Sequence, residues 1–312
     1  MREFLMSYFD WEPVIGLEIH AQLKTESKIF SSDATTFNAG DNENVSSVRL
    51  GLPGSLPVIN KRVVEMSIRA GLALNCKIAK QCEFARKNYF YPDLPKGYQI
   101  SQYDQPICLN GHLEFFVDKK KKQVNIVRAH MEEDAGKSTH QGAFTLINFN
   151  RAGIPLLEIV SAPEIYSPQE AAEYVKSIRQ VLQYVDVCDG NLEKGSVRWD
   201  CNVSVRRRGE PQLRTRVEIK NLNSFRFIEK AIDFEIHRQI DCYEANEIVA
   251  QETRLYDSVK NKTYSMRIKE DIEDYRYFPD PDLVPLHISK EWIEQIANQL
   301  PELPLSKRTR FI

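Results

Sequence analysis

Acidic and histidine side chains are embedded in apolar runs that resemble β-strands, and this pattern limits the folds open to the chain. Glu18 and His20 stand two residues apart in the run 16–20, so a strand with a period of two places both on one face. Glu158 lies inside a second apolar run, residues 154–160. A carboxylate buried in such a run is unfavourable unless a cation compensates its charge. The pattern therefore predicts a cation site on a sheet, with Mg²⁺ held by oxygen ligands and an imidazole.

Length and charge narrow the class of protein only coarsely. The chain has 312 residues, of which 28% are charged, and a formal net charge of −2. This length suffices for one large or two ordinary domains of a soluble globular protein. A near-neutral total neither predicts nor excludes nucleic-acid binding, because phosphate contacts need a local basic patch.

Cysteine usage and hydropathy indicate the cellular compartment. The six cysteines are scattered and include no Cys-x-x-Cys pair, which favours reduced thiols in a cytoplasmic protein. No segment approaches the roughly 20 apolar residues that would span a bilayer, so we expect no membrane association.

Helix and strand signals predict an α+β fold. Residues 61–74 are expected to form a helix capped by Asn60, and Ser167-Pro168-Gln169-Glu170 marks the start of another helix with a capping box. Further expected elements are a helix over 224–240, a short helix from Ser289 that Pro301 and Pro304 stop, and strands over 113–117, 124–129, 197–205 and 214–219. Because strands and helices do not alternate strictly, we expect a large, mainly antiparallel sheet flanked by helices.

Several familiar catalytic motifs are excluded by inspection. Gly136-Lys137-Ser138 mimics the end of a Walker A loop, but Met131 stands where the first glycine is required. His130-Met131-Glu132 matches part of a zinc deaminase motif without its Pro-Cys-x-x-Cys partner. The sequence also contains neither Gly-x-Gly-x-x-Gly nor Gly-x-Ser-x-Gly. If the protein forms an amide bond, its ammonia must be released elsewhere.

One long stretch, residues 84–102, crowds aromatic, basic and turn residues together around Pro92 and Pro95. It closely resembles the signature of the B subunits of tRNA-dependent amidotransferases, which convert Glu-tRNA(Gln) to Gln-tRNA(Gln) and, in many bacteria, Asp-tRNA(Asn) to Asn-tRNA(Asn). Further blocks resemble the family in the family's order: residues 16–20, 51–57, 130–137, 150–158, 189–191, 218–224 and 274–282.

The resemblance implies an ATP-dependent ligase that phosphorylates the side-chain carboxylate on misacylated tRNA with the help of Mg²⁺. Ammonia would come from the amidase component of a heterotrimer, whose third component is a small protein. Residues 1–290 would form the cradle-shaped catalytic domain. Residues 291–312 would begin a C-terminal helical region that is truncated here, so that the helical and tail domains of the family are absent and tRNA affinity is poor.

The resemblance also assigns site residues. The metal-binding set would be Glu18, His20, Glu133 and Glu158. Lys87 and Arg151 would bind the nucleotide. The catalytic or channel-lining positions would be Glu133, Lys87, Tyr89, Asp200, Glu218 and Lys220. Glu218 or Asp200 could remove the proton when ammonia attacks.

The chain departs from many relatives at the positions where they carry cysteines suited to structural zinc. The corresponding residues are Ser31, Asp33, Ser46 and Arg49, so structural zinc is not expected. Glu132 and Asp134 alternate with Glu133 and are expected to face away from it, either solvated or outside the set of metal ligands.

Two other functions remain open from the residues alone. The same carboxylates would suit a metal-dependent hydrolase, in which a metal-bound water replaces ATP. A non-catalytic tRNA-binding or assembly module would keep the fold without turnover. ATP consumption that depends on aminoacyl-tRNA distinguishes all three.

Overall fold

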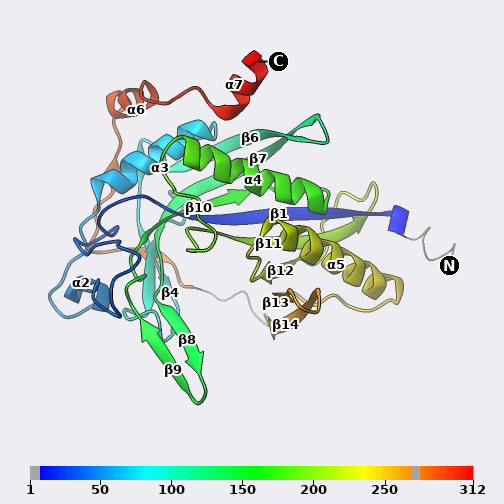
Figure 1. Cartoon of the computed structure of the whole chain (residues 1–312), viewed down its shortest axis with the longest axis horizontal. Helices are drawn as coiled ribbons and strands as arrows, with labels where there is room; N and C mark the ends of the chain where they lie inside the picture. The colour runs from blue at the N-terminus through cyan, green and yellow to red at the C-terminus, as the bar shows by residue number, and fades with distance from the viewer. Residues whose placement is uncertain (1–7, 269–274, 312) are drawn as a thin grey trace.

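The computed structural model describes residues 8–268 and 275–311, so Asp274 of the last resemblance block lies outside the described residues. A large sheet organises the molecule (Figure 1). Its strands are β1 (Trp11–Gln22), β2 (Lys77–Ile78), β6 (Cys108–Val117), β7 (Lys120–Glu133), β10 (Pro155–Ser161), β11 (Val197–Arg207), β12 (Val217–Lys220), β13 (Glu252–Asp257) and β14 (Lys262–Ile268). They lie in the order β14-β13-β12-β11-β1-β10-β7-β6-β2.

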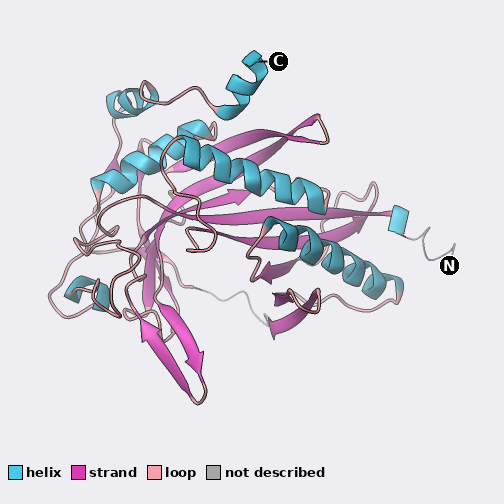
Figure 2. Ribbon diagram, in the orientation of Figure 1, coloured by secondary structure: helices cyan, strands magenta, loops and turns pink. Residues whose placement is uncertain are grey.

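Every neighbouring pair in this sheet is antiparallel except β12 and β13. Three helices, α3 (Lys61–Ala73), α4 (Pro168–Tyr184) and α5 (Phe225–Glu244), cover one face (Figures 1 and 2). The predicted α+β fold with a mainly antiparallel sheet flanked by helices is therefore confirmed.

The helix starts follow the capping residues that the sequence indicates. The Asn60 side chain accepts a hydrogen bond from a first-turn N–H of α3, and Ser224 does the same for α5. At α4, Ser167 Oγ accepts from the Glu170 N–H at 3.1 Å, while Glu170 Oε2 accepts from the N–H of Tyr166 at 2.8 Å. The Glu170 carboxylate thus reaches one residue further back than the usual capping box.

Removing the cap of α4 should have a measurable cost. We expect Ser167→Ala to lower the free energy of unfolding by about 1 kcal/mol, because an N–H of the first turn loses its acceptor. Urea unfolding monitored by circular dichroism measures this change. Ser167→Asp keeps a side-chain acceptor and serves as the control; equal stability of the alanine variant and the wild type would contradict the role of the cap.

The two faces of the sheet differ in chemistry. Towards the helices, the central strands present apolar side chains that are at most 1% exposed, among them Leu17, Ile19, Leu157, Ile159 and Val203. Because side chains alternate along a strand, the residues between them point to the opposite face. That opposite face carries the acidic and histidine side chains.

Smaller elements border this polar face. The strands β4 (Ala85–Asn88), β5 (Tyr98–Ser101) and β15 (Phe278–Pro279) form a three-stranded sheet with β4 in the middle. The hairpin of β8 (Lys137–Gln141) and β9 (Phe144–Asn148) projects from the body (Figure 1). The strands β3 (Gln81–Cys82) and β16 (Leu286–His287) pair with each other.

The last helices are short. The helix α6 (Lys290–Ala297) contacts α3 and buries Ile296. The short helix expected from Ser289 ends before Pro301 and Pro304, as predicted. Pro304 also begins a further helix, α7 (Pro304–Phe311), as its fixed φ angle and missing N–H allow at a first helical position. In residues 8–268 and 275–311, no helix combines the length and apolarity that crossing a membrane requires.

The four positions compared above with zinc ligands lie around the short helix α2 (Ser47–Leu50). Asp33 Oδ2 accepts hydrogen bonds from Ser31 Oγ at 2.6 Å and from Ser46 Oγ at 2.8 Å. The guanidinium of Arg49 is buried and pairs with Glu133. Hydrogen bonds and an ion pair thus connect these loops.

Candidate functional site

The polar face gathers its side chains through strand register. In the pairing of β1 with β10, His20 lies opposite Glu158. In the pairing of β1 with β11, His20 lies opposite Arg198 and Glu18 lies opposite Asp200. Directly opposed residues share a face of the sheet, so three strands bring these side chains together.

The same register extends the polar face in both directions. Glu158 lies opposite His130 of β7, and Leu156 lies opposite Glu132. On the other side, Asn202 lies opposite Glu218 of β12. The polar stripe therefore crosses five neighbouring strands, β12, β11, β1, β10 and β7.

A cavity of about 870 Å³ opens over this stripe. Side chains of both charges meet in it, and the charged residues that line it are His20, Lys87, Glu132, Glu193, Lys194, Arg198, Asp200 and Lys220. A smaller cavity of about 420 Å³ adjoins the stripe at Glu18 and Asn202.

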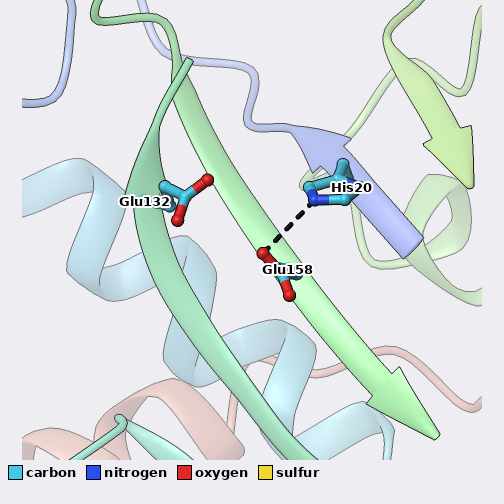
Figure 3. A group of neighbouring side chains, drawn as sticks. All are labelled: His20, Glu132 and Glu158. Carbon is cyan, nitrogen blue, oxygen red and sulfur yellow. Dashed lines mark ion pairs between the residues drawn. The ribbon is translucent and has the colours of Figure 1, made fainter. Parts of the chain in front are cut away.

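His20, Glu132 and Glu158 form a group that could hold a metal ion (Figure 3). Their ligand atoms lie within 4.8 Å of one another, and His20 Nε2 lies 3.2 Å from Glu158 Oε2. Glu132 Oε2 is buried, and within the described part of the chain no donor hydrogen-bonds to it. An imidazole nitrogen and carboxylate oxygens, one of them without a hydrogen bond, fit a hard divalent cation such as Mg²⁺.

The charges of this group depend on one another. Burial alone would lower the pKa of His20, but the adjacent Glu158 carboxylate raises that pKa to about 8. Burial would raise the pKa of Glu158, but His130, His20 and Lys87 hold it well below its usual range. Glu158 is therefore ionised at neutral pH and is the anionic centre of the group.

Lys87 extends over this group from β4. Its Nζ lies 3.7 Å from Glu132 Oε2 and 5.1 Å from the ring centroid of Tyr275. Although burial opposes the charge, the carboxylates of Glu132 and Glu158 keep the pKa of Lys87 well above its ordinary value. A fixed ammonium group thus lines the cavity, and its role in binding the nucleotide stays a prediction.

A second acidic group lies beside the first on the same face. One ligand atom from each of Glu18, Asp200 and Glu218 lies within 4.8 Å of the others. Lys220 Nζ lies 2.7 Å from Asp200 Oδ2 and 3.2 Å from Glu218 Oε1, so an ammonium offsets part of the negative charge of this group. Burial and the neighbouring carboxylates raise the pKa of Glu18, whose Oε1 accepts a hydrogen bond from Asn202 Nδ2 at 3.0 Å.

The four predicted metal ligands are not brought together as one set, and this is a correction. His20 and Glu158 meet, Glu18 lies in the second acidic group, and Glu133 points to the other side of β7. There the Glu133 carboxylate pairs with Arg49 and Lys96 and accepts the Ile100 N–H at 2.9 Å. Glu132, which was expected to lie solvated or outside the ligand set, is 3% exposed and lines the cavity. Alternation along β7 exchanges the expected roles of the two glutamates.

Two other predicted residues, Tyr89 and Arg151, are not among the described residues that line the cavity. The Tyr89 hydroxyl donates to Gln99 Oε1 at 2.6 Å, and burial raises the pKa of Tyr89, so the phenol is protonated. Arg151 donates to the carbonyl oxygens of Ala135 and Gly136, and it is not among the described residues that line the cavity. Its assignment to nucleotide binding stays a prediction.

Some residues of the site were not predicted. Gln99 and Arg198 line the cavity, and Arg198 Nη2 donates to Asp134 Oδ2 at 2.9 Å. The carboxylates of Glu132 and Glu158 contribute to raising the pKa of Tyr277 to about 12, after the larger effect of burial, so this phenol also lies near the metal-capable group. The signal for Glu132 was present in the sequence: it lies two residues from His130 and therefore on the same face of the strand.

Comparison with known proteins gives one consistent result. The sequence model of the GatB/GatE catalytic domain matches residues 13–294. A curated protein of Bdellovibrio bacteriovorus, named as the B subunit of aspartyl/glutamyl-tRNA(Asn/Gln) amidotransferase, is 64% identical over 306 residues, which are 98% of this chain and 64% of that protein. Proteins of the same name from Thermodesulfovibrio yellowstonii and Vesicomyosocius okutanii are 57% and 56% identical, each over 97% of this chain. The chain spans 64% of the length of each of these relatives.

Proposed function

This chain belongs to the GatB/GatE catalytic domain family, and from that membership we propose that it activates the amino acid carried on a misacylated tRNA. The substrate would be the side-chain carboxylate of Glu-tRNA(Gln), Asp-tRNA(Asn) or both. The observation that carries this proposal is the cavity lined by His20, Glu132 and Lys87, where Glu158 completes the metal-capable group with His20 and Glu132 and the Lys87 ammonium lies 3.7 Å from Glu132. A divalent cation and a lysine side by side are what phosphoryl transfer to an anion requires.

In the first step, a carboxylate oxygen of the substrate attacks the γ-phosphorus of ATP. A bond forms between this oxygen and phosphorus, the bond to the β-phosphate oxygen breaks, and ADP leaves. Both reactants are anions, so Lys87 reduces their repulsion and binds the transferring phosphoryl group. Mg²⁺ held by His20, Glu132 and Glu158 would supply further charge neutralisation.

In the second step, ammonia attacks the acyl phosphate carbon. A carbon–nitrogen bond forms, inorganic phosphate leaves with the electrons of the carbon–oxygen bond, and the nitrogen loses a proton. Asp200 lines the cavity and is suited to accept that proton. The chain carries no recognised nucleophile motif for releasing ammonia, so the ammonia would come from an amidase partner, with a small third protein completing a cytoplasmic heterotrimer.

Replacing Lys87 tests this function. We expect Lys87→Met to lower the rate of ADP formation by about 10²–10³-fold, because a fixed positive charge is lost from the transferring phosphoryl group. The measurement is Mg²⁺-dependent ADP release from ATP by the protein assembled with its amidase and small partners, with and without Glu-tRNA(Gln). Lys290→Met, at a side chain that is 80% exposed, is the matched control.

The outcomes separate three functions. ADP release that needs misacylated tRNA and collapses in Lys87→Met supports the proposal. Metal-dependent hydrolysis that needs neither ATP nor a partner would favour a hydrolase, and tRNA binding without ADP release would favour an assembly module.

A further inference from the structure

The segment that carries Lys87 is not part of the nine-stranded sheet. It belongs to the hairpin of β4 and β5, in which Lys87 lies directly opposite Gln99. The metal-capable group is fixed by ladder hydrogen bonds of the large sheet. The hairpin is held beside that sheet by a backbone hydrogen bond from the Gly136 N–H to the Asp93 carbonyl oxygen at 2.8 Å and by side-chain contacts with the end of β7. What anchors the hairpin therefore decides where the Lys87 ammonium lies.

The side-chain anchor is a buried ion cluster at the end of β7. The Glu133 carboxylate, which is 4% exposed, pairs through Oε2 with Arg49 and through Oε1 with Lys96. The same Oε1 accepts the N–H of Ile100 in β5. Lys96 and Ile100 belong to the hairpin and its connection, so one carboxylate fixes both to the strand that carries Glu132.

Gln99 extends this anchor towards Tyr89. Its Nε2 donates to the carbonyl oxygen of Glu133 at 2.7 Å, and its Oε1 accepts from the Tyr89 hydroxyl at 2.6 Å. A carboxamide can donate at one end and accept at the other, whereas a carboxylate or a thioether of similar length cannot do both. On the other side of Lys87, Asn88 Nδ2 donates to the carbonyl oxygens of Tyr275 and Arg276.

We propose that Glu133 and Gln99 are positioning residues that fix Lys87 and Tyr89 over the metal-capable group. This inference rests on the proposed function and adds to it that the two neighbouring glutamates of β7 have different roles. Glu132 faces the cation, and Glu133, on the opposite face, holds the hairpin that supplies the lysine. Neither Glu133 nor Gln99 then needs to be a ligand of the metal.

Two substitutions and their combination test the proposal in the assembled enzyme. Gln99→Met removes both side-chain hydrogen bonds at similar volume, and Tyr89→Phe removes one of them. We expect Gln99→Met to lower kcat for tRNA-dependent ADP formation by about 10–100-fold, because small misplacements of reacting groups cost that much. Mn²⁺ affinity should stay within about twofold of the wild type, since the metal-capable residues are unchanged, and Tyr89→Phe should add little to Gln99→Met because both act through one contact.

Amide hydrogen exchange can be measured without catalytic turnover, so it tests the positioning role independently of the proposed function. We expect amide hydrogen exchange in residues 86–101 to quicken about tenfold in Gln99→Met, the equivalent of one lost hydrogen bond. Glu133→Gln should quicken it at least as much, and Glu133→Asp should restore part of the protection because it keeps the charge. Gln123→Met, at an exposed glutamine of β7 that lies opposite Glu114 of β6, is the control.

Three results would overturn the proposal. The first is unchanged exchange in residues 86–101 in Gln99→Met. The second is a loss of Mn²⁺ affinity in Gln99→Met as large as that in Glu132→Gln, which would make Gln99 part of the metal site. The third is additive loss of kcat in the double variant, which would make Tyr89 act on the substrate independently of Gln99. If the wild type forms no ADP but the exchange results hold, the proposed function fails and the positioning role stands.

Discussion

Replacing Glu132 with glutamine is expected to lower the affinity of this protein for Mn²⁺ by at least about 100-fold and tRNA-dependent ADP formation by about 10³-fold. The reason is the position of its side chain: Glu132 Oε2 is buried beside His20 and Glu158 without a hydrogen bond from the described residues. A carboxamide would present either a neutral oxygen or an N–H group to the cation, and both weaken the coordination of a hard ion.

Isothermal titration with Mn²⁺ measures the affinity, and ADP release by the assembled enzyme measures the reaction. Glu247→Gln, at an exposed glutamate after α5, is the control. Glu133→Gln is the more stringent control, because it makes the same glutamate-to-glutamine change at the neighbouring residue. We expect this variant to keep its Mn²⁺ affinity. If Glu133→Gln abolished metal binding and Glu132→Gln did not, the division of roles along β7 would be wrong.

Adding one methyl group at Gly153 should destabilise the protein more than any surface substitution. Gly153 has a φ of +84°, and a Cβ built there would overlap Arg49 Nη1 and lie 2.5 Å from Arg49 Cδ. An alanine therefore meets an unfavourable backbone conformation and displaces the guanidinium that pairs with Glu133. Because breaking a buried ion pair costs about 3–5 kcal/mol, we expect Gly153→Ala to lower the free energy of unfolding by about 4 kcal/mol.

Gly142→Ala separates the two causes. Gly142 also has a positive φ, +58°, but nothing lies within 4 Å of a Cβ built there. We expect this control to cost only about 1 kcal/mol, the effect of the backbone conformation alone. Urea unfolding of both variants measures the difference, and equal losses would show that Arg49 moves aside without cost.

Local signals in the sequence were sufficient for most of the fold. The caps at Asn60, Ser167 and Ser224 determine where α3, α4 and α5 begin, because each supplies an acceptor to the first helical turn. Apolar runs located the central strands, because a strand that is buried on one face alternates its side chains between the two faces. The helix that Pro301 and Pro304 were expected to stop does end before them, but the helix α7 that Pro304 begins was not predicted, because a proline can follow one helix and also begin the next.

The candidate site was less predictable because it depends on register between distant strands. His20 and Glu158 stood out as polar residues in apolar runs, and the structure pairs them. The spacing from His130 to Glu132 showed that these two residues share a face of β7. That this face, and not the face of Glu133, is the one shared with Glu158 depends on the register of β7 against β10, which neither strand contains by itself. The sequence did not indicate a role for Gln99. Its side-chain hydrogen bonds go to Tyr89, on the other side of the β4–β5 connection, and to Glu133 in the separate strand β7.

Lys220 gives the polar face a cation that cannot diffuse away. Its ammonium pairs with the carboxylates of Asp200 and Glu218, which belong with Glu18 to the second acidic group, and these two carboxylates raise the pKa of Lys220 although burial would lower it. If the group at His20 binds a divalent ion as proposed, that ion exchanges with the solution, whereas the Lys220 ammonium does not. A chelator would then remove the ion at His20 and leave the Lys220 ammonium in place, so we expect depletion of Mg²⁺ to abolish the proposed phosphoryl transfer while the sheet stays folded.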